Sequence, residues 1–224
     1  MQTIKAILDF LSELESHNQR EWFQEHKGAF EEIKASFEHM TQSLIDLLQL
    51  EDESFSGLQA KDCIFRIYRD LRFSKDTAPY KTHLGAYLAP GGRKSELCGY
   101  YLQLKPHGQS LIAGGLFAPS PAVLYEVRDA IYAAPEDFKA IISAPAFVKT
   151  FGSIEGEKLK RAPKGFPKSF EAVDLLKHKS FIARRTLSDA QVSSENFTTL
   201  ALNTFRKLRP FNDFFNKAIR HMEG

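Results

Sequence analysis

The sequence predicts an α+β fold: an antiparallel sheet with helices packed mainly on one face and helical segments at both ends of the chain. Three observations lead to this prediction. Apolar residues recur at steps of three and four over residues 4–48, which is typical of amphipathic helices. Short runs of alternating residues follow between 82 and 117, separated by Gly and Pro. Helical spacing returns after residue 120, with one late alternating run at 178–185.

Two helices are predicted in the N-terminal quarter of the chain. Thr3 is a suitable N-cap for the first, whose apolar positions run from Ile4 to Leu14. Asn18 and Glu21 match a capping box, so we expect a second, long helix to begin there. Its inward face is predicted to hold Phe23, His26, Phe30, Ile33, Phe37, Met40, Leu44 and Leu48.

The middle of the chain predicts a meander of at least three antiparallel strands. A strand over 63–68 is expected first, followed by irregular chain and a turn at 77–79. Alternation and turn residues then predict strands over 82–88, 99–105 and 109–117, with a hairpin loop at 106–108.

The C-terminal part predicts further helices. Ser120 before Pro121 is a strong helix start, because an N-cap precedes a proline at the first helical position. Ser188 can cap a turn of helix, and Pro210 is expected to separate two closing helices. The expected elements are helices from 121 to 134, 136–144, 171–176, 193–208 and 211–222, and a strand over 178–185.

Length and composition indicate a globular protein. The 224 residues allow one large domain or two small ones, and 43% apolar residues with 19 Phe provide a core. Cys63 and Cys98 lie among apolar neighbours outside any Cys-x-x-Cys pair, which indicates buried free thiols in a reducing compartment. There is no signal-peptide pattern and no membrane-spanning window, so we expect a soluble cytoplasmic protein without a membrane partner.

Charge is unevenly distributed, although the net charge is only +2. Residues 1–56 carry 4 basic and 12 acidic side chains, a net of −8, and residues 158–185 carry 9 basic and 2 acidic, a net of +7. The acidic excess is explained by a solvated helix face. The basic excess indicates either an anionic partner or one of two complementary surfaces within the fold.

The most unusual stretch is residues 65–83, in which aromatic residues are interleaved with cations. The basic positions are Arg66, Arg69, Arg72, Lys75 and Lys81. A spacing of three aligns side chains on neither a strand nor an α-helix. Two interpretations follow. Asp70 and Asp76 hold the cations within the loop, or the loop directs the cations at a bound anion.

A second basic group follows residue 158, and convergence of the two groups would form a cationic cleft. Arg offers a planar fork for phosphate or carboxylate, and Lys offers a point charge. The candidate ligand-binding residues are Arg66, Arg69, Arg72, Lys75, Tyr80, Lys81, Tyr100, Lys160, Arg161, Lys164 and Lys179. His83 titrates near neutral pH when unperturbed, so it is the candidate general acid or base, with a structural histidine as the alternative.

Three stretches carry a resemblance to a known family: residues 18–27, residues 65–83, and residues 159–166 followed by 178–181. Together they resemble a widespread microbial family catalogued as domain of unknown function 2461. The resemblance covers nearly the whole chain and implies a single compact domain over 1–224. It implies no reaction, substrate or cofactor. His17 departs from the family, in which Asn is expected in many relatives.

The sequence leaves three hypotheses of function. The first is a cationic pocket for a small phosphorylated or carboxylated ligand, with or without turnover. The second is a protein-interaction or structural domain whose Arg clusters act as internal clamps. The third, a nucleic-acid-binding module, ranks last because the overall charge is balanced. Nucleotide-binding, nucleophile-elbow and zinc motifs are all absent, so we predict neither a metal site nor a cofactor.

Overall fold

The computed structural model describes residues 3–72 and 77–222 and confirms the α+β class. The α-helices are α1 (Ile4–Ser16), α2 (Arg20–Glu25), α3 (Lys27–Gln49), α4 (Ala60–Cys63), α5 (Pro121–Ala133), α6 (Pro135–Ser143), α7 (Pro145–Phe151), α8 (Val173–Leu176), α9 (Asp189–Val192) and α10 (Phe197–Arg220). Two short 3-10 helices are η1 (Glu53–Phe55) and η2 (Gly92–Lys94). An antiparallel sheet pairs β1 (Leu84–Leu88), β2 (Gly99–Leu104), β3 (Ser110–Leu116) and β4 (Phe181–Leu187) in that order.

The contacts within the chain divide it into two compact units. Unit 1 comprises Met1–Arg93, Tyr101–Ile112 and Thr186–Leu202. Unit 2 comprises Lys94–Tyr100, Ala113–Arg185 and Asn203–Gly224. A single compact domain over 1–224 therefore stays a prediction.

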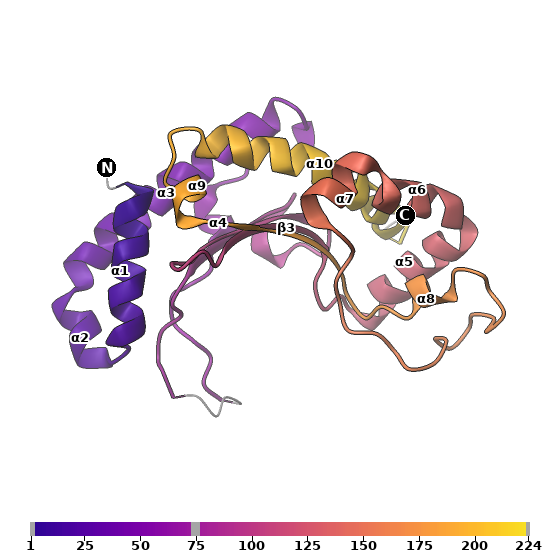
Figure 1. Ribbon diagram of the computed structural model, residues 1–224, viewed down its shortest axis with the longest axis horizontal. Helices are drawn as coiled ribbons and strands as arrows, with labels where there is room; N and C mark the ends of the chain where they lie inside the picture. The colour runs from indigo at the N-terminus through magenta and orange to yellow at the C-terminus, as the bar shows by residue number, and fades with distance from the viewer. Residues whose placement is uncertain (1–2, 73–76, 223–224) are drawn as a thin grey trace. The chain divides into compact units, whose positions relative to one another are not determined.

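Unit 1 is built on helices α1 and α3, which lie side by side in Figure 1. Thr3 caps α1 as predicted, because its hydroxyl accepts a hydrogen bond from the Ala6 N–H at 3.3 Å. Helical spacing of apolar residues turns one face of each helix inward. The fully buried positions include Leu11, Leu14, Phe37, Leu44 and Ile45.

The predicted capping box at Asn18 is wrong. Gln19 is the N-cap of α2, and the Asn18 side chain instead binds both backbone groups of Tyr80. The predicted long helix is also two helices, because His26 leaves helical geometry at φ −101° and ψ 13° and separates α2 from α3. The Nδ1 atom of His26 lies 2.8 Å from the Trp22 carbonyl oxygen, which gives that helix-end carbonyl a side-chain partner.

The central strands follow the predicted alternation of inward and outward side chains. In the part of β2 that belongs to unit 1, Leu102 and Leu104 are fully buried, whereas Tyr101 and Gln103 are half-buried. The buried side chains contribute to the core of unit 1. The half-buried ones form the opposite face of the strand.

Helix α10 contributes much of the core of unit 2 and corrects the prediction of two closing helices. Pro210 lies inside α10 instead of ending a helix. Proline removes one helical hydrogen bond, but most helical stability in proteins comes from packing of an apolar face. That packing outweighs the missing bond, since the neighbouring apolar side chains are fully buried. They are Phe205, Leu208, Phe211 and Phe215.

Two buried amide side chains of α10 bind the backbone of strand residues. Asn212 donates through Nδ2 to the Gly99 carbonyl at 2.9 Å and accepts from the Gly115 N–H at 2.8 Å. One turn later, Asn216 donates to the Cys98 carbonyl at 3.0 Å and accepts from the Cys98 N–H at 2.7 Å. These bonds give side-chain partners to buried backbone groups.

Local signals in the second half of the chain give mixed results. Ser120 and Ser188 are both N-caps, as predicted. Ser120 caps α5, and Ser188 forms a capping box with Gln191. Helix α7 was not predicted. The sequence indicates Pro145 only as the end of the preceding helix, but Pro145 is also the first residue of α7. Cys63 and Cys98 are buried free thiols. Within residues 3–72 and 77–222, no helix has the length and apolar character needed to cross a bilayer.

Substitution of Gly115 tests how tightly α10 is packed. Gly115 has φ 98°, and a Cβ there would lie 2.7 Å from a Phe211 ring carbon and collide with the Phe181 carbonyl. We expect Gly115→Ala to lower the free energy of unfolding by about 2–4 kcal/mol in urea denaturation, from backbone strain and overpacking together. The matched control is Gly28→Ala in α3, where no atom lies within 4 Å of the new methyl group. It is expected to raise the free energy by about 0.5–1 kcal/mol, and equal stability of the two variants would contradict this packing.

Candidate functional site

An irregular arm of two antiparallel segments in unit 1 holds the first basic group. The predicted strand over 63–68 is wrong in part, because α4 includes Cys63 and isolated bridges follow. These bridges pair Ile64 with Ala86 and Tyr68 with Tyr80, in the two adjacent purple segments of Figure 1. The predicted turn at 77–79 is also wrong. The Pro79 carbonyl accepts a hydrogen bond from the Arg69 N–H at 2.9 Å, so these residues run beside the first segment.

Arg72 in this arm has a carboxylate partner. Its Nε lies 3.0 Å from one oxygen of Asp70 and its Nη2 lies 2.6 Å from the other. Hydrogen bonds from Arg72 lower the pKa of Asp70 to about 2. Both side chains are exposed. Lys75, predicted as a ligand-binding residue, lies outside the described residues.

Two more cations of the arm bind backbone carbonyls. Arg69 donates through Nη1 to the Ala78 carbonyl at 3.3 Å. Lys81 donates through Nζ to the Arg66 carbonyl at 2.9 Å. These bonds fix the direction of both side chains and do not neutralise their charge, since a carbonyl carries no net charge.

Half-buried side chains gather on the outward face of the sheet in unit 1, around His83. Alternation places His83 and Gly85 on one face, and Tyr101 and Lys105 share a face of the neighbouring strand and its end. Gly85 lets the two strands' side chains meet on this face. The Tyr101 ring lies where a side chain at position 85 would stand. A Cβ at Gly85 would lie 2.8 Å from the Tyr101 phenol oxygen.

Aromatic rings line this face. The ring centres of Phe65 and Tyr101 are 6.2 Å apart in an edge-to-face arrangement. Lys81 Nζ lies 5.7 Å from the centre of the Phe65 ring. The Tyr101 hydroxyl donates to the Gln103 side-chain oxygen at 3.1 Å, and burial raises the pKa of Tyr101 to about 12. The Tyr101 phenol is therefore a neutral group near pH 7.

His83 lies in a cationic environment. Burial, followed by the positive charges of Lys81 and Lys105, lowers the pKa of His83 to about 4. Burial and the charge of Arg66 also lower the pKa of Lys81. Across the described ranges 3–72 and 77–222, no carboxylate forms an ion pair with Lys81 or Lys105. His83 is thus neutral at pH 7, which suits a proton acceptor and not a proton donor.

Tyr80 and Tyr100, both predicted to bind a ligand, lie in apolar cores. Their residues are 3% and 6% exposed. The Tyr80 ring stacks on Phe23 with centres 4.0 Å apart, and the Tyr100 ring stacks on Phe205 at 4.6 Å. Core packing accounts for both rings in this structure.

The second basic group lies in unit 2. Lys160, Arg161 and Lys164 are exposed on the irregular chain between α7 and α8. Lys179 pairs through Nζ with Glu157 at 2.6 Å. The two basic groups belong to different units, and their convergence into one cleft stays a prediction.

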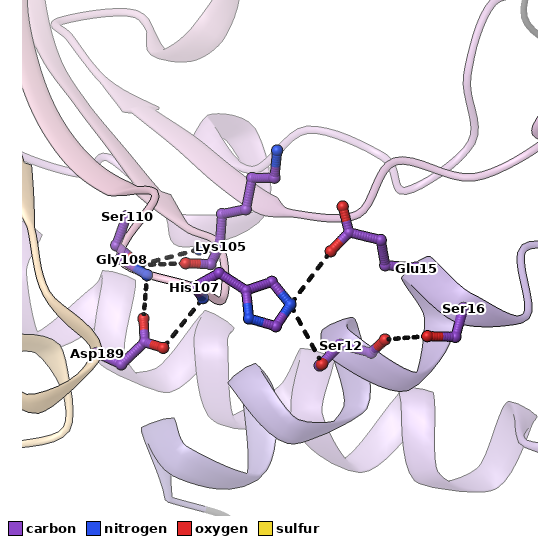
Figure 2. Close-up of polar contacts among 8 residues, drawn as sticks. All are labelled: Ser12, Glu15, Ser16, Lys105, His107, Gly108, Ser110 and Asp189. Carbon is purple, nitrogen blue, oxygen red and sulfur yellow. Dashed lines mark hydrogen bonds and ion pairs between the residues drawn. The ribbon is translucent and has the colours of Figure 1, made fainter.

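Sequence reasoning missed a polar cluster at the tip of the β2–β3 hairpin, shown in Figure 2. His107 and Gly108 have φ 63° and 67°, which turns both backbone N–H groups to one side. The Asp189 carboxylate accepts from them at 3.0 Å and 2.9 Å. The turn at His107 and Gly108 can be recognised in the sequence, but its distant partner Asp189 cannot.

The same hairpin contacts helix α1 through the His107 ring. Nε2 lies 3.4 Å from the Glu15 carboxylate and 3.4 Å from the Ser12 hydroxyl, and Figure 2 shows both contacts on one ring nitrogen. A nucleophile–base–acid relay needs the hydroxyl on one nitrogen and the acid on the other. The cluster is therefore an anchor between the hairpin, α1 and α9, not a hydrolase triad.

Comparison with known proteins places the chain in one family. A family profile described as "Conserved hypothetical protein (DUF2461)" matches residues 6–214. Searches of curated proteins and of solved structures gave no match. Among residues 3–72 and 77–222, no three His, Cys, Asp or Glu side chains are placed to hold a metal ion.

The pKa of His83 has a consequence for stability that can be measured. The unfolded chain takes up the proton near the ordinary value of 6.5, whereas the folded chain takes it up near 4. The unfolded state therefore binds more protons between these values, and the free energy of unfolding falls as the pH decreases from about 6.5 to about 4. We expect NMR titration of the His83 ring to give a pKa near 4, and Lys105→Met to raise it. A His83 pKa at or above 6.5 would contradict the described environment.

Proposed function

The chain belongs to the family of conserved hypothetical proteins DUF2461, and we propose that it binds a small phosphorylated or carboxylated molecule on the outward face of the sheet in unit 1. The residues proposed to contact this ligand are Arg66, Lys81, His83, Tyr101 and Lys105. The observation that supports the proposal is the surplus of positive charge around His83. Two ammonium groups act on this ring and no described carboxylate pairs with either.

Electrostatic cost favours a negatively charged ligand. Lys81 is partly desolvated, and a partly buried cation is costly unless an anion compensates it. A phosphate or carboxylate group would supply that charge and accept hydrogen bonds from the ammonium groups. Phe65 and Tyr101 would offer apolar surface to the rest of the ligand.

The role of His83 in this proposal follows from its protonation state. A neutral imidazole can accept a proton or a hydrogen bond from a ligand hydroxyl. A bound anion would raise the pKa of His83 from its value of about 4, because negative charge favours the protonated ring. The geometry supports binding, and any turnover would use His83 as a base.

A second candidate function is a structural or interaction domain with internal clamps. It is favoured by Arg72, which holds both carboxylate oxygens of Asp70, and by Arg69, which holds the Ala78 carbonyl. Both guanidinium groups act within the arm. This candidate accounts for Arg69 and Arg72 and leaves the charge around His83 without a role.

The proposal is tested by anion binding at matched ionic strength. We expect phosphate, citrate or a sugar phosphate to raise the wild-type stability above that in chloride, by about 2.7 kcal/mol at a hundredfold excess over the dissociation constant. Lys81→Met and Lys105→Met should each weaken binding about tenfold or more, because a charged hydrogen bond contributes about 1.5–3 kcal/mol. Calorimetric titration gives the dissociation constants.

Lys27→Met is the matched control, because Lys27 is an exposed lysine at the start of α3 in the same unit. Its affinity for the anion should equal that of the wild type. Unchanged affinity in both Lys81→Met and Lys105→Met would exclude this face as the site. Absence of any anion effect on the wild type would favour the clamp function.

A further inference from the structure

Unit 1 contains a pocket of about 340 Å³ between α3 and the start of α4, which we call the α3–α4 pocket. Glu38, His39 and Gln42 line it from α3, where residues three and four apart share one face of the helix. Gln59 and Lys61 line it from the chain at the start of α4. Small-molecule sites range from about 300 to 1,000 Å³, so the pocket is large enough for a small ligand.

The walls of the pocket are joined by the Gln42 side chain. Its oxygen accepts a hydrogen bond from the Ala60 N–H at 2.8 Å. Its nitrogen donates to the Asp46 carboxylate at 2.8 Å and to the Leu58 carbonyl at 3.4 Å. Both N–H groups of this amide are therefore in use, so Gln42 fixes α3 against the chain that enters α4. Space remains between the walls because Ala35 and Ala60, which also line the pocket, have small side chains.

The other polar side chains of the pocket are available to a ligand. Gln59 is the N-cap residue of α4, and its side chain makes no capping hydrogen bond. Within residues 3–72 and 77–222, neither the half-buried Glu38 nor the exposed Lys61 has an ion-pair partner. A carboxylate and an ammonium group thus line one pocket without pairing with each other.

This arrangement of charge selects a class of ligand. A simple anion in the pocket would be attracted by Lys61 and repelled by Glu38, and a simple cation would meet the reverse. Electrostatic complementarity disfavours both, because like charges brought together are unfavourable. A molecule with one charge of each sign can place each charge beside its opposite.

We propose that the α3–α4 pocket binds a small zwitterion, an amino acid with one ammonium and one carboxylate group. Glu38 would accept hydrogen bonds from the ammonium group, and Lys61 would donate to the carboxylate. Gln59 and His39 would provide further hydrogen-bonding groups. The inference goes beyond the proposed function, because it uses other residues and does not depend on the site around His83.

The test is calorimetric titration of the full chain carrying Lys81→Met and Lys105→Met, in which the anion site around His83 is removed. The probes are the linear amino acids from glycine to 6-aminohexanoate, with the carboxylate and the amine of matching length as single-charge analogues. We expect one molecule of the best-fitting amino acid to bind about tenfold or more tightly than either analogue, since each analogue lacks one charged hydrogen bond.

Substitution of either charged residue should weaken this binding. In the same background, we expect Glu38→Gln and Lys61→Met each to raise the dissociation constant about tenfold or more, while far-UV circular dichroism shows a folded protein. Glu25→Gln and Lys27→Met are the matched controls, because both residues are exposed in unit 1 and outside the pocket. Both controls should leave the constant unchanged.

A spectroscopic readout locates the bound amino acid without a substitution in the pocket. NMR should show it shifting the ring signals of His39 and leaving those of His83 in place. Absence of binding by the whole series, equal affinity for the single-charge analogues, or unchanged affinity in Glu38→Gln or Lys61→Met would overturn the inference. Unshifted His39 signals at saturation would also overturn it.

Discussion

The paired amides of Asn212 and Asn216 are the interaction on which unit 2 depends. They bind backbone groups of residues in β2, β3 and the chain just before β2, so a helix face supplies hydrogen-bond partners to the backbone of strand residues. Glycine permits this close approach, because a Cβ at Gly114 would lie 3.0 Å from the Asn212 amide oxygen. An aliphatic residue at 212 or 216 would remove these partners from buried N–H and C=O groups, and loss of a partner by a buried polar group costs more than the bond itself contributes.

Unit 1 applies the same chemistry at the base of its arm. The Asn18 amide donates to the Tyr80 carbonyl at 3.0 Å and accepts from the Tyr80 N–H at 3.1 Å. The Tyr80 ring is thereby held against Phe23 in the core. Lys81 follows Tyr80 directly in the chain, and its charge acts on His83. The hydrogen bonds of the Asn18 side chain, which lies outside the proposed anion site, thus hold the chain that leads into this site.

Features of the fold that depend on close neighbours in the chain were predictable, and features that depend on distant partners were not. The caps at Ser120 and Ser188 bind N–H groups three residues away, so a short motif identifies them. Asn18 carries an equally good motif, but a strand-like partner 62 residues away takes its amide. Pro210 is a local break signal that long-range packing of Phe211 and its neighbours overrides.

Prediction of the candidate site was limited for the same reason, because the site depends on contacts between residues that are distant in the sequence. Composition locates the cations, but only register brings Lys105 to His83. The ordinary titration of histidine was a poor guide, because burial and uncompensated cations keep this ring neutral. An anion beside His83 would favour the protonated ring, and by linkage the proposed binding would take up protons. The surroundings that suppress protonation of His83 in the free protein therefore make the pKa of this ring responsive to an anion bound at the proposed site.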